Sequence, residues 1–191
     1  MMDVTAGHVV LLDEIGEPCG SAQKSQVHTA DTPLHLGFSC HLISAHGQVL
    51  VTRRALTKRT WPGVWTNSFC GHPQPEETME EAVRRHARHE LGMELDTVES
   101  ALPEFRYRAT DASGVVENEI CPVFIAKVTA EPDPRPHPDE VAELVWVRPE
   151  QLRTAVEATP WAFSPWLVLQ VPQMALYRLA PAASDVEEPA P

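Results

Sequence analysis

The stretch from Thr78 to Leu91 is the clearest helix in the sequence, and it constrains how the rest of the chain can pack. Four glutamates lie around its first turn and three arginines follow in its second half, which is the order that a helix dipole favours. Gly92 stands where such a helix is expected to end. Apolar residues recur at helical spacing and mark a single buried face: Met79, Ala82, Val83, Ala87 and Leu91.

Short segments with strand character surround this helix. The patterns predict strands at 8–12, 34–44, 48–53, 98–110, 115–130 and 144–147. They also predict a helical turn within 21–29, a helix at 149–158, and a last helix at 164–179 that Pro172 should kink. Strands and hairpins around a few helices indicate the α+β class. We expect one domain over residues 1–180 and a disordered, acidic, proline-rich tail at 181–191.

Composition excludes several kinds of partner. The chain has 191 residues and a net charge of −12, which argues against nucleic acid or an acidic membrane. No apolar run approaches the roughly 20 residues that span a bilayer, and the first residues lack a secretory signal. The four cysteines show no paired spacing. We therefore expect a cytoplasmic protein with reduced thiols and no membrane partner.

The segment from Trp65 to Pro73 holds the most reactive pair of side chains. Cys70 and His72 are two positions apart, so in a strand both project to one face. Gly71 between them lets another group approach the backbone closely. A thiol and an imidazole on one face can perform acid–base chemistry, bind a metal, or divide these tasks.

A basic cluster stands out against the acidic total. Arg53, Arg54, Lys58 and Arg59 precede the cysteine segment, and Lys24 is a further candidate. Such clusters are often solvated surface. The position of this one, just before Cys70, favours an anion site.

A set of histidines and glutamates suits a metal ion. Glu117 and Glu119 share one face of a predicted strand, as alternate residues do. Imidazoles together with carboxylates suit Zn²⁺ or Mn²⁺, and the candidate ligands are His28, His35, His72, Glu117 and Glu119. Spacing alone is weak evidence, since the chain has nine histidines. We interpret four of the others as surface or core residues: His8, His41, His46 and His137.

The helix and the residues before it keep the frame of the Nudix box, G-x5-E-x7-R-E-U-x-E-E-x-G-U. The frame is kept at Gly71, Glu77, Arg85 and the run Glu90 to Met93. His86 and His89 stand where the box has glutamates of its metal cluster. One carboxylate, Glu90, can still hold Mg²⁺ when phosphate oxygens and water complete the shell. A single remaining glutamate is a poor basis for the full metal cluster that activates water in a hydrolase.

Longer runs resemble the type 1 isopentenyl diphosphate isomerases. They are residues 51–58, the run from Trp61 to Pro73, the triplet at 117–119 and the run from Phe163 to Trp166, in the family's order. The resemblance covers roughly residues 5–180. It implies a Nudix-like α/β/α sandwich with a mixed central sheet. It also implies an isomerase of isoprenoid biosynthesis that interconverts isopentenyl and dimethylallyl diphosphate.

The resemblance implies a role for each matching residue. The catalytic set is Cys70, Glu119 and Tyr107, with the thiol and the carboxyl on opposite sides of the double bond. A Zn²⁺ or Mn²⁺ ion is held by His28, His35, His72, Glu117 and Glu119, and Glu90 helps to hold a Mg²⁺ that meets the diphosphate. The substrate-binding set is Lys24, Arg54, Lys58, Ser68 and Trp166. His86 stands where the family often has arginine, for which Arg85 or Arg88 could compensate.

The expected reaction is a metal-dependent 1,3-allylic proton shift. Protonation of the terminal alkene carbon gives a tertiary cation, and loss of a proton from C2 completes the shift. We expect Glu119 to deliver the proton and Cys70 to accept one from the opposite face. A small-molecule prenyl diphosphate is the expected partner of a monomer or weak homodimer.

Two other functions fit part of the pattern. A Nudix hydrolase of a nucleoside diphosphate derivative would use the helix frame, but it leaves Cys70 unexplained. A non-catalytic module that binds diphosphate or metal would use the basic cluster and the histidines. Release of phosphate from nucleotides would indicate the first, and absence of an allylic product from isopentenyl diphosphate the second.

Overall fold

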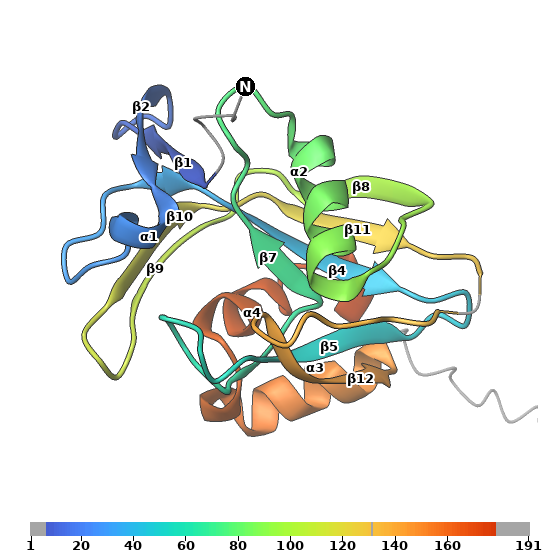
Figure 1. The fold of residues 1–191 in the computed structure, drawn as a ribbon. Coiled ribbons are helices and arrows are strands. Elements are labelled where there is room, and N and C mark those ends of the chain that lie inside the picture. The colour runs from blue at the N-terminus through green and yellow to red at the C-terminus, as the bar shows by residue number, and fades with distance from the viewer. Residues whose placement is uncertain (1–6, 131, 179–191) are drawn as a thin grey trace, which may run out of the picture.

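The computed structural model describes residues 7–130 and 132–178, and a mixed sheet lies at its centre (Figure 1). The strand order is β12-β5-β4-β11-β8, with β6 paired to β5 and β7 paired to β4. β4 and β11 run parallel, whereas the other neighbours are antiparallel. The strands are β4 (Phe38–Ile43), β5 (Val49–Arg54), β6 (Trp65–Thr66), β7 (Phe69–Gly71), β8 (Thr97–Leu102), β11 (Val123–Lys127) and β12 (Val141–Val147).

Helices cover both faces of this sheet. Figure 1 shows α2 (Met79–His86) above it, and α3 (Pro149–Ala158) and α4 (Pro165–Gln170) beneath it. Alternation along β4 explains both layers, because Cys40 and Leu42 pack with α2 while His41 contacts Gln170 of α4. The expected α/β/α sandwich with a mixed central sheet, and with it the α+β class, is confirmed.

A second, five-stranded sheet stands at one end of the sandwich (Figure 1), in the order β2-β1-β3-β10-β9. Its strands are β1 (His8–Leu12), β2 (Pro18–Gln23), β3 (His35–Leu36), β9 (Arg106–Thr110) and β10 (Val116–Ile120), and the short helix α1 (Lys24–Val27) follows β2. Glu119 of β10 pairs with His35 on one side and with Tyr107 on the other. Three predicted site residues therefore lie on neighbouring strands.

Three predicted strands are each divided between the two sheets. Residues 98–110 form β8 and β9, and residues 115–130 form β10 and β11. Pro103 and Pro122 lie in the gaps, where a residue without a backbone N–H cannot extend a ladder. The third, 34–44, divides at Gly37 into β3 and β4. Single long strands were the wrong prediction here.

The helix that begins at Thr78 is confirmed, with a change of geometry near its end. Thr78 and Glu81 form a reciprocal capping box at its start. After His86 the chain continues as a π-helix (Ala87–Leu91), a form that is frequent at functional sites. Gly92 ends it in the left-handed conformation, with φ of 64°.

The C-terminal segment differs from its prediction. α4 ends at Gln170, before Pro172, and a 3-10 turn (Ala175–Tyr177) follows, so the proline ends this helix instead of kinking it. The predicted acidic tail at 181–191 lies outside the described residues. No helix within the described ranges is both long and apolar enough to cross a bilayer.

Candidate active site

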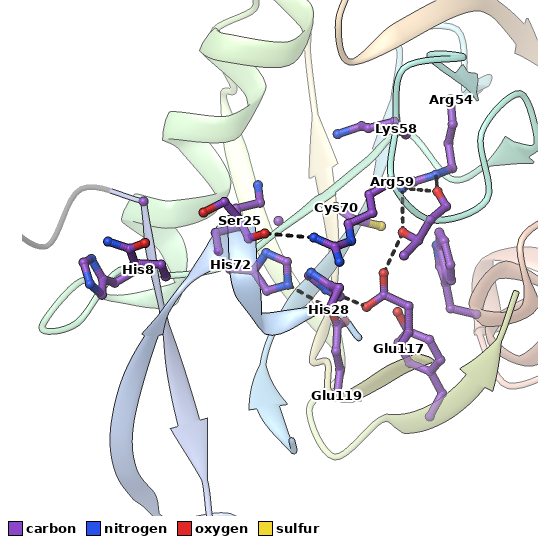
Figure 2. Close-up of a pocket in the computed structure, with 17 residues that line it drawn as sticks. His8, Ser25, His28, Arg54, Lys58, Arg59, Cys70, His72, Glu117 and Glu119 are labelled. Carbon is purple, nitrogen blue, oxygen red and sulfur yellow. Dashed lines mark hydrogen bonds and ion pairs between the residues drawn. The ribbon is translucent and has the colours of Figure 1, made fainter. Parts of the chain in front are cut away.

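A cavity of about 630 Å³ opens where the two sheets meet (Figure 2). Both sheets line it, as do α1, α4 and the loop from Ala55 to Val64. Most of the residues expected to act together share this cavity: Lys24, His28, Arg54, Lys58, Cys70, His72, Tyr107, Glu117, Glu119 and Trp166. It also contains His8, interpreted above as a surface or core residue, and Arg59, which was assigned no individual role.

Four of the predicted metal ligands converge at one end of the cavity. One ligand atom from each of His28, His35, His72 and Glu119 lies within 4.8 Å of the other three. The rings come from the residue after α1, from β3 and from the chain after β7, and their centroids are 5.1 to 5.6 Å apart. The fifth, Glu117, has its Oε2 2.9 Å from His28 Nε2. We call these five residues the histidine wall.

Four polar atoms of the histidine wall are buried without a hydrogen bond: His28 Nε2, His35 Nε2, His72 Nδ1 and Glu117 Oε2. The Nδ1 atom of His35 lies 3.0 Å from the Pro33 carbonyl and donates to it, which leaves Nε2 with its lone pair in the neutral ring. The His35 Nε2 atom is 3.4 Å from Glu119 Oε1. A cation between them satisfies both atoms, so the donor set fits a divalent metal ion.

Burial and charge shift the pKa values in this wall. Burial lowers the pKa of His72 to about 3, despite the opposing effect of Glu119. Burial also lowers the pKa of His35, but the Glu119 carboxylate outweighs this and the pKa is raised. Desolvation would raise the pKa of Glu119, yet the two histidines hold it well below its usual range. Glu119 is therefore a carboxylate at neutral pH.

Glycine permits the approach of Glu119. A Cβ atom on Gly37 would lie 2.5 Å from Glu119 Oε2, closer than real contacts allow. Gly37 has no positive φ, so the requirement at this position is for space. At Gly71 a Cβ would meet the His86 ring at 2.4 Å, so this glycine accommodates a histidine of the helix.

Thr60 connects the histidine wall to the basic cluster. Its hydroxyl donates to Glu117 Oε1 at 2.7 Å and accepts from Arg54 Nη2 at 3.2 Å. The threonine is buried, as is Glu117. Sequence reasoning missed it, because a threonine in a basic loop carries no signal of its own.

Cys70 is held by two hydrogen-bond partners on the other side of the cavity. Its Sγ lies 3.3 Å from Ser39 Oγ and 3.2 Å from Asn67 Oδ1. The Asn67 amide nitrogen bonds two backbone carbonyls, so its oxygen must face the cysteine. The same oxygen accepts from the indole of Trp166 at 2.9 Å. We call Ser39, Asn67, Cys70 and Gln170 the thiol wall; sequence reasoning missed Asn67.

Burial raises the pKa of the Cys70 thiol to about 11, against the opposing hydrogen bonds of Ser39 and Asn67. Together with the depressed pKa of Glu119, this gives a thiol beside a carboxylate at neutral pH. One member of the pair is protonated and the other is not, as a two-group proton shift requires.

Cationic side chains face the cavity above these walls, and Figure 2 labels Arg54, Lys58 and Arg59 there. Lys58 pairs with Glu140, and Arg59 donates to the Ser25 carbonyl at 2.9 Å. Burial and the charge of Lys58 lower the pKa of Lys24. We call Lys24, Arg54, Lys58 and Arg59 the cationic rim. Two lysines at one cavity whose charges repel each other suit a polyanion.

Two aromatic residues, Tyr107 and Trp166, line the cavity. Trp166 meets Trp61 edge to face with centroids 5.5 Å apart, and the Arg54 guanidinium lies 5.3 Å from the Trp166 ring centroid. Tyr107 lies beside Trp166 and opposite Glu119 in the ladder. In the part of the chain that is described, its hydroxyl makes no hydrogen bond to Glu119. The side chains bring an apolar surface next to the thiol and the carboxylate.

Other predicted residues lie outside the cavity lining. Glu90 is buried behind it, with Oε1 2.7 Å from His86 Nδ1, and desolvation is outweighed by His86 and the lysines, so its pKa is lowered. Ser68 is fully buried, donating to Leu50 O and accepting from Leu42 N at 2.7 Å each. The structure does not bring its hydroxyl to the cavity. Arg85 pairs with Glu77, and Arg88 with Glu94, so neither fills the place of an arginine at 86.

Comparisons with known proteins agree on this chain's relatives. The model of the NUDIX domain matches residues 33–167. An isopentenyl-diphosphate Delta-isomerase of Clavibacter michiganensis is 66% identical over 86% of this chain and 84% of its own length. Relatives of the same name from Kocuria rhizophila and Citrobacter koseri are 60% and 54% identical, covering 90% and 87% of this chain and 94% and 91% of their own lengths.

The chain belongs to the isopentenyl-diphosphate Delta-isomerase family. Solved structures share the fold of this family at low sequence identity. A protein from Deinococcus radiodurans has a TM-score of 0.68 at 22% identity, covering 88% of this chain and 99% of its own. A MutT NUDIX hydrolase from Burkholderia pseudomallei has a TM-score of 0.55 at 22% identity, covering 73% and 97%. These likenesses establish a Nudix fold, and the expected family and fold are confirmed.

Proposed function

We propose that this chain is an isopentenyl-diphosphate Delta-isomerase, which interconverts isopentenyl and dimethylallyl diphosphate in isoprenoid biosynthesis. One observation carries the proposal: a thiol and a carboxylate, Cys70 and Glu119, line one cavity beneath a cationic rim. The names of relatives at 54% to 66% identity support it. A hydrolase site would require carboxylates where His86 and His89 stand.

The cationic rim is the proposed binding site for the diphosphate. Lys24 and Lys58 supply ammonium donors, and Arg54 and Arg59 supply guanidinium groups that match phosphate oxygens. We propose that Glu90 contributes to a Mg²⁺ ion that reaches the diphosphate, since Mg²⁺ commonly binds one or two carboxylates plus substrate phosphates. The hydrocarbon end then lies against Trp166 and Trp61.

Cys70 and Glu119 are the proposed acid and base on the two faces of the double bond. One group adds a proton to the terminal carbon and the other removes a proton from C2, so the bond moves by one position without a redox change. An alkene is a very weak base, so both groups must be held close to it and away from water. The indole face of Trp166 can stabilise the tertiary cation by on the order of 2 kcal/mol when it is desolvated.

The histidine wall would hold one Zn²⁺ or Mn²⁺ ion, with nitrogen from His28, His35 and His72 and oxygen from Glu117 and Glu119. The bound ion would supply positive charge that stabilises the Glu119 carboxylate. Tyr107, beside Glu119, is proposed to orient the substrate's alkene end. The four free thiols suit a reducing compartment, and we propose the cytoplasm.

Incubation of the purified chain with isopentenyl diphosphate and Mg²⁺ tests the function directly. We expect dimethylallyl diphosphate as the product, with deuterium incorporated when the reaction is run in D₂O. A product without deuterium would contradict protonation and deprotonation. Release of phosphate from nucleotides in place of an allylic product would indicate a hydrolase.

A further inference from the structure

A line of hydrogen bonds runs from Cys70 into the core between the sheet and α4. Cys70 Sγ is 3.3 Å from Ser39 Oγ, which accepts from Gln170 Nε2 at 2.9 Å. Gln170 Oε1 is 3.0 Å from His41 Nε2, and His41 Nδ1 is 2.6 Å from the Tyr177 hydroxyl. Ser39, His41 and Gln170 are fully buried and Tyr177 is 2% exposed. We call these four residues the relay.

The far end of the relay determines its direction. In the described part of the chain, the only partner of the Tyr177 hydroxyl is His41 Nδ1. A buried hydroxyl that donates to nothing would lose its hydrogen bond without compensation. Tyr177 must therefore donate to Nδ1, which requires that nitrogen to be unprotonated. Burial lowers the pKa of His41 to about 4, so the ring is neutral at pH 7.

Each later bond follows from that first one. A neutral ring without a proton on Nδ1 carries it on Nε2, so His41 donates to Gln170 Oε1. The Gln170 amide nitrogen then donates to Ser39 Oγ. The Ser39 hydrogen is left to point at sulfur, and Cys70 Sγ at 3.3 Å is closer than Cys121 Sγ at 3.6 Å.

We propose that Tyr177, His41 and Gln170 are positioning residues for Cys70, acting as a one-way relay that makes Ser39 a hydrogen-bond donor to the catalytic sulfur. The role rests on the proposed isomerase function. Without the relay, the Ser39 hydroxyl is free to turn toward Gln170 and leave the sulfur. With it, the donor faces the sulfur before the reaction begins and stays there while the Cys70 proton is transferred.

The relay joins three segments of the chain in one line of hydrogen bonds, an arrangement that the side chains of the histidine wall do not have. The relay starts in β4 and α4 and ends in the 3-10 turn, so three separate segments fix one hydroxyl. Two of its members, His41 and Gln170, make their side-chain hydrogen bonds only within it, in the ranges that the structure describes. Polar groups are costly to bury, so a fully buried histidine and glutamine in an apolar layer require hydrogen bonds such as those of the relay.

The first experiment measures the tautomer of His41. In protein with ¹⁵N-labelled histidine, the His41 ring should show a protonated Nε2 and an unprotonated Nδ1. In Tyr177→Phe, which removes one oxygen, only Gln170 Oε1 still favours the proton on Nε2, so the tautomer with the proton on Nδ1 should gain population. A His41 that carries its proton on Nδ1 in the wild-type chain would overturn the proposal, whatever the activity of the enzyme.

The second experiment separates kcat from KM. Gln170→Met keeps the length of the side chain but cannot donate to Ser39. We expect kcat to fall about tenfold, the effect of one net hydrogen bond, with KM within about twofold. Tyr177→Phe should lower kcat by about threefold, although its hydroxyl lies at the far end of the relay. Met174→Leu, a buried neighbour outside the relay, should leave kcat unchanged.

The outcomes distinguish this inference from the proposed function. No isomerisation by the wild-type chain defeats the function. An active wild type whose kcat is unaffected by Gln170→Met and Tyr177→Phe defeats the relay alone. If Gln170→Met fails to fold, Tyr177→Phe still decides the case, and a kcat loss in Met174→Leu as large as in Gln170→Met would assign the effect to packing.

Discussion

The two walls of the cavity differ in how their polar atoms are satisfied. The histidine wall holds four buried atoms without a hydrogen bond: His28 Nε2, His35 Nε2, His72 Nδ1 and Glu117 Oε2. In the thiol wall, the side-chain polar atoms of Ser39, Asn67 and Gln170 are all hydrogen-bonded within the protein. One wall is complete only when a cation is added, whereas the other is complete as folded.

This difference separates two ways of holding a proton-transfer group. Glu119 is positioned by groups that need a metal ion, so its environment depends on what is bound. Cys70 is positioned by neutral hydrogen bonds whose partners lie in the core. The comparison predicts that metal removal affects one wall and core substitutions the other, and the four changes below test this.

The largest effect is expected from Cys70→Ala. Loss of one acid–base group should lower kcat by about 10²–10⁴-fold, because positioned proton transfer contributes in that range. Binding of inorganic diphosphate, measured by calorimetry, should be largely unchanged because the cationic rim is untouched. Cys19→Ala is the matched control, since Cys19 is exposed and outside the cavity. Retained turnover in Cys70→Ala would remove the thiol from the mechanism.

Chelation should act on the histidine wall. Treatment with EDTA should abolish isomerisation and lower the melting temperature, and added Zn²⁺ or Mn²⁺ should restore both. A metal ion whose free concentration is about 100 times its Kd stabilises the folded state by about 2.7 kcal/mol. His28→Asn should lose this stabilisation, and His137→Asn, a histidine outside the wall, should keep it. A melting temperature indifferent to EDTA would contradict the metal site.

The relay predicts a pH effect on stability. His41 has its pKa lowered from 6.5 to about 4 by burial, so the unfolded chain binds its proton first as the pH falls. Its contribution to stability is complete above pH 6.5 and is lost progressively towards pH 4, by about 3 kcal/mol in total. Urea unfolding at pH 7.5 and pH 5 should show a smaller loss for His41→Gln than for the wild type. An equal loss in both would exclude His41 as its source.

Thr60→Val should give the smallest effect. It removes the hydroxyl that donates to Glu117 and leaves the shape of the side chain intact. Loss of a group that orients a metal ligand typically weakens metal affinity, here by roughly tenfold. Competition with a chromogenic chelator measures this, and Thr66→Val, in the neighbouring strand away from Glu117, serves as the control. Equal affinities in both variants would separate Thr60 from the metal site.

The fold was largely predictable because its cues are local. The apolar spacing from Met79 to Leu91 and the stop at Gly92 are enough to place the helix. The divided strands were missed because alternation continues across Pro103 and Pro122, and only pairing shows that the chain changes sheets there. Pro172 correctly indicates a break in the last helix. Whether the helix kinks or ends at a proline depends on the contacts of the residues that follow it.

The site was predictable where a residue carries its own chemistry. Cysteine, histidine and glutamate are reactive residue types that stand out in a family pattern. The structure brings five of them to one cavity: Cys70, His28, His72, Glu117 and Glu119. Thr60, Asn67 and Gln170 act through the residues they contact, and these contacts join residues 27 to 131 positions apart. Ser68 shows the converse, since Cys70, two positions later, lines the cavity while the Ser68 hydroxyl bonds to the core.

Gly37 illustrates how an empty volume can be as restrictive as a functional group. No side chain fits there without displacing Glu119, since even a methyl group would meet its carboxylate at 2.5 Å. In a saturation-mutagenesis screen of cells whose growth depends on this isomerase, position 37 should tolerate as few replacements as position 119. The backbone at 37 is accessible to any amino acid, so what selection would preserve there is the absence of an atom.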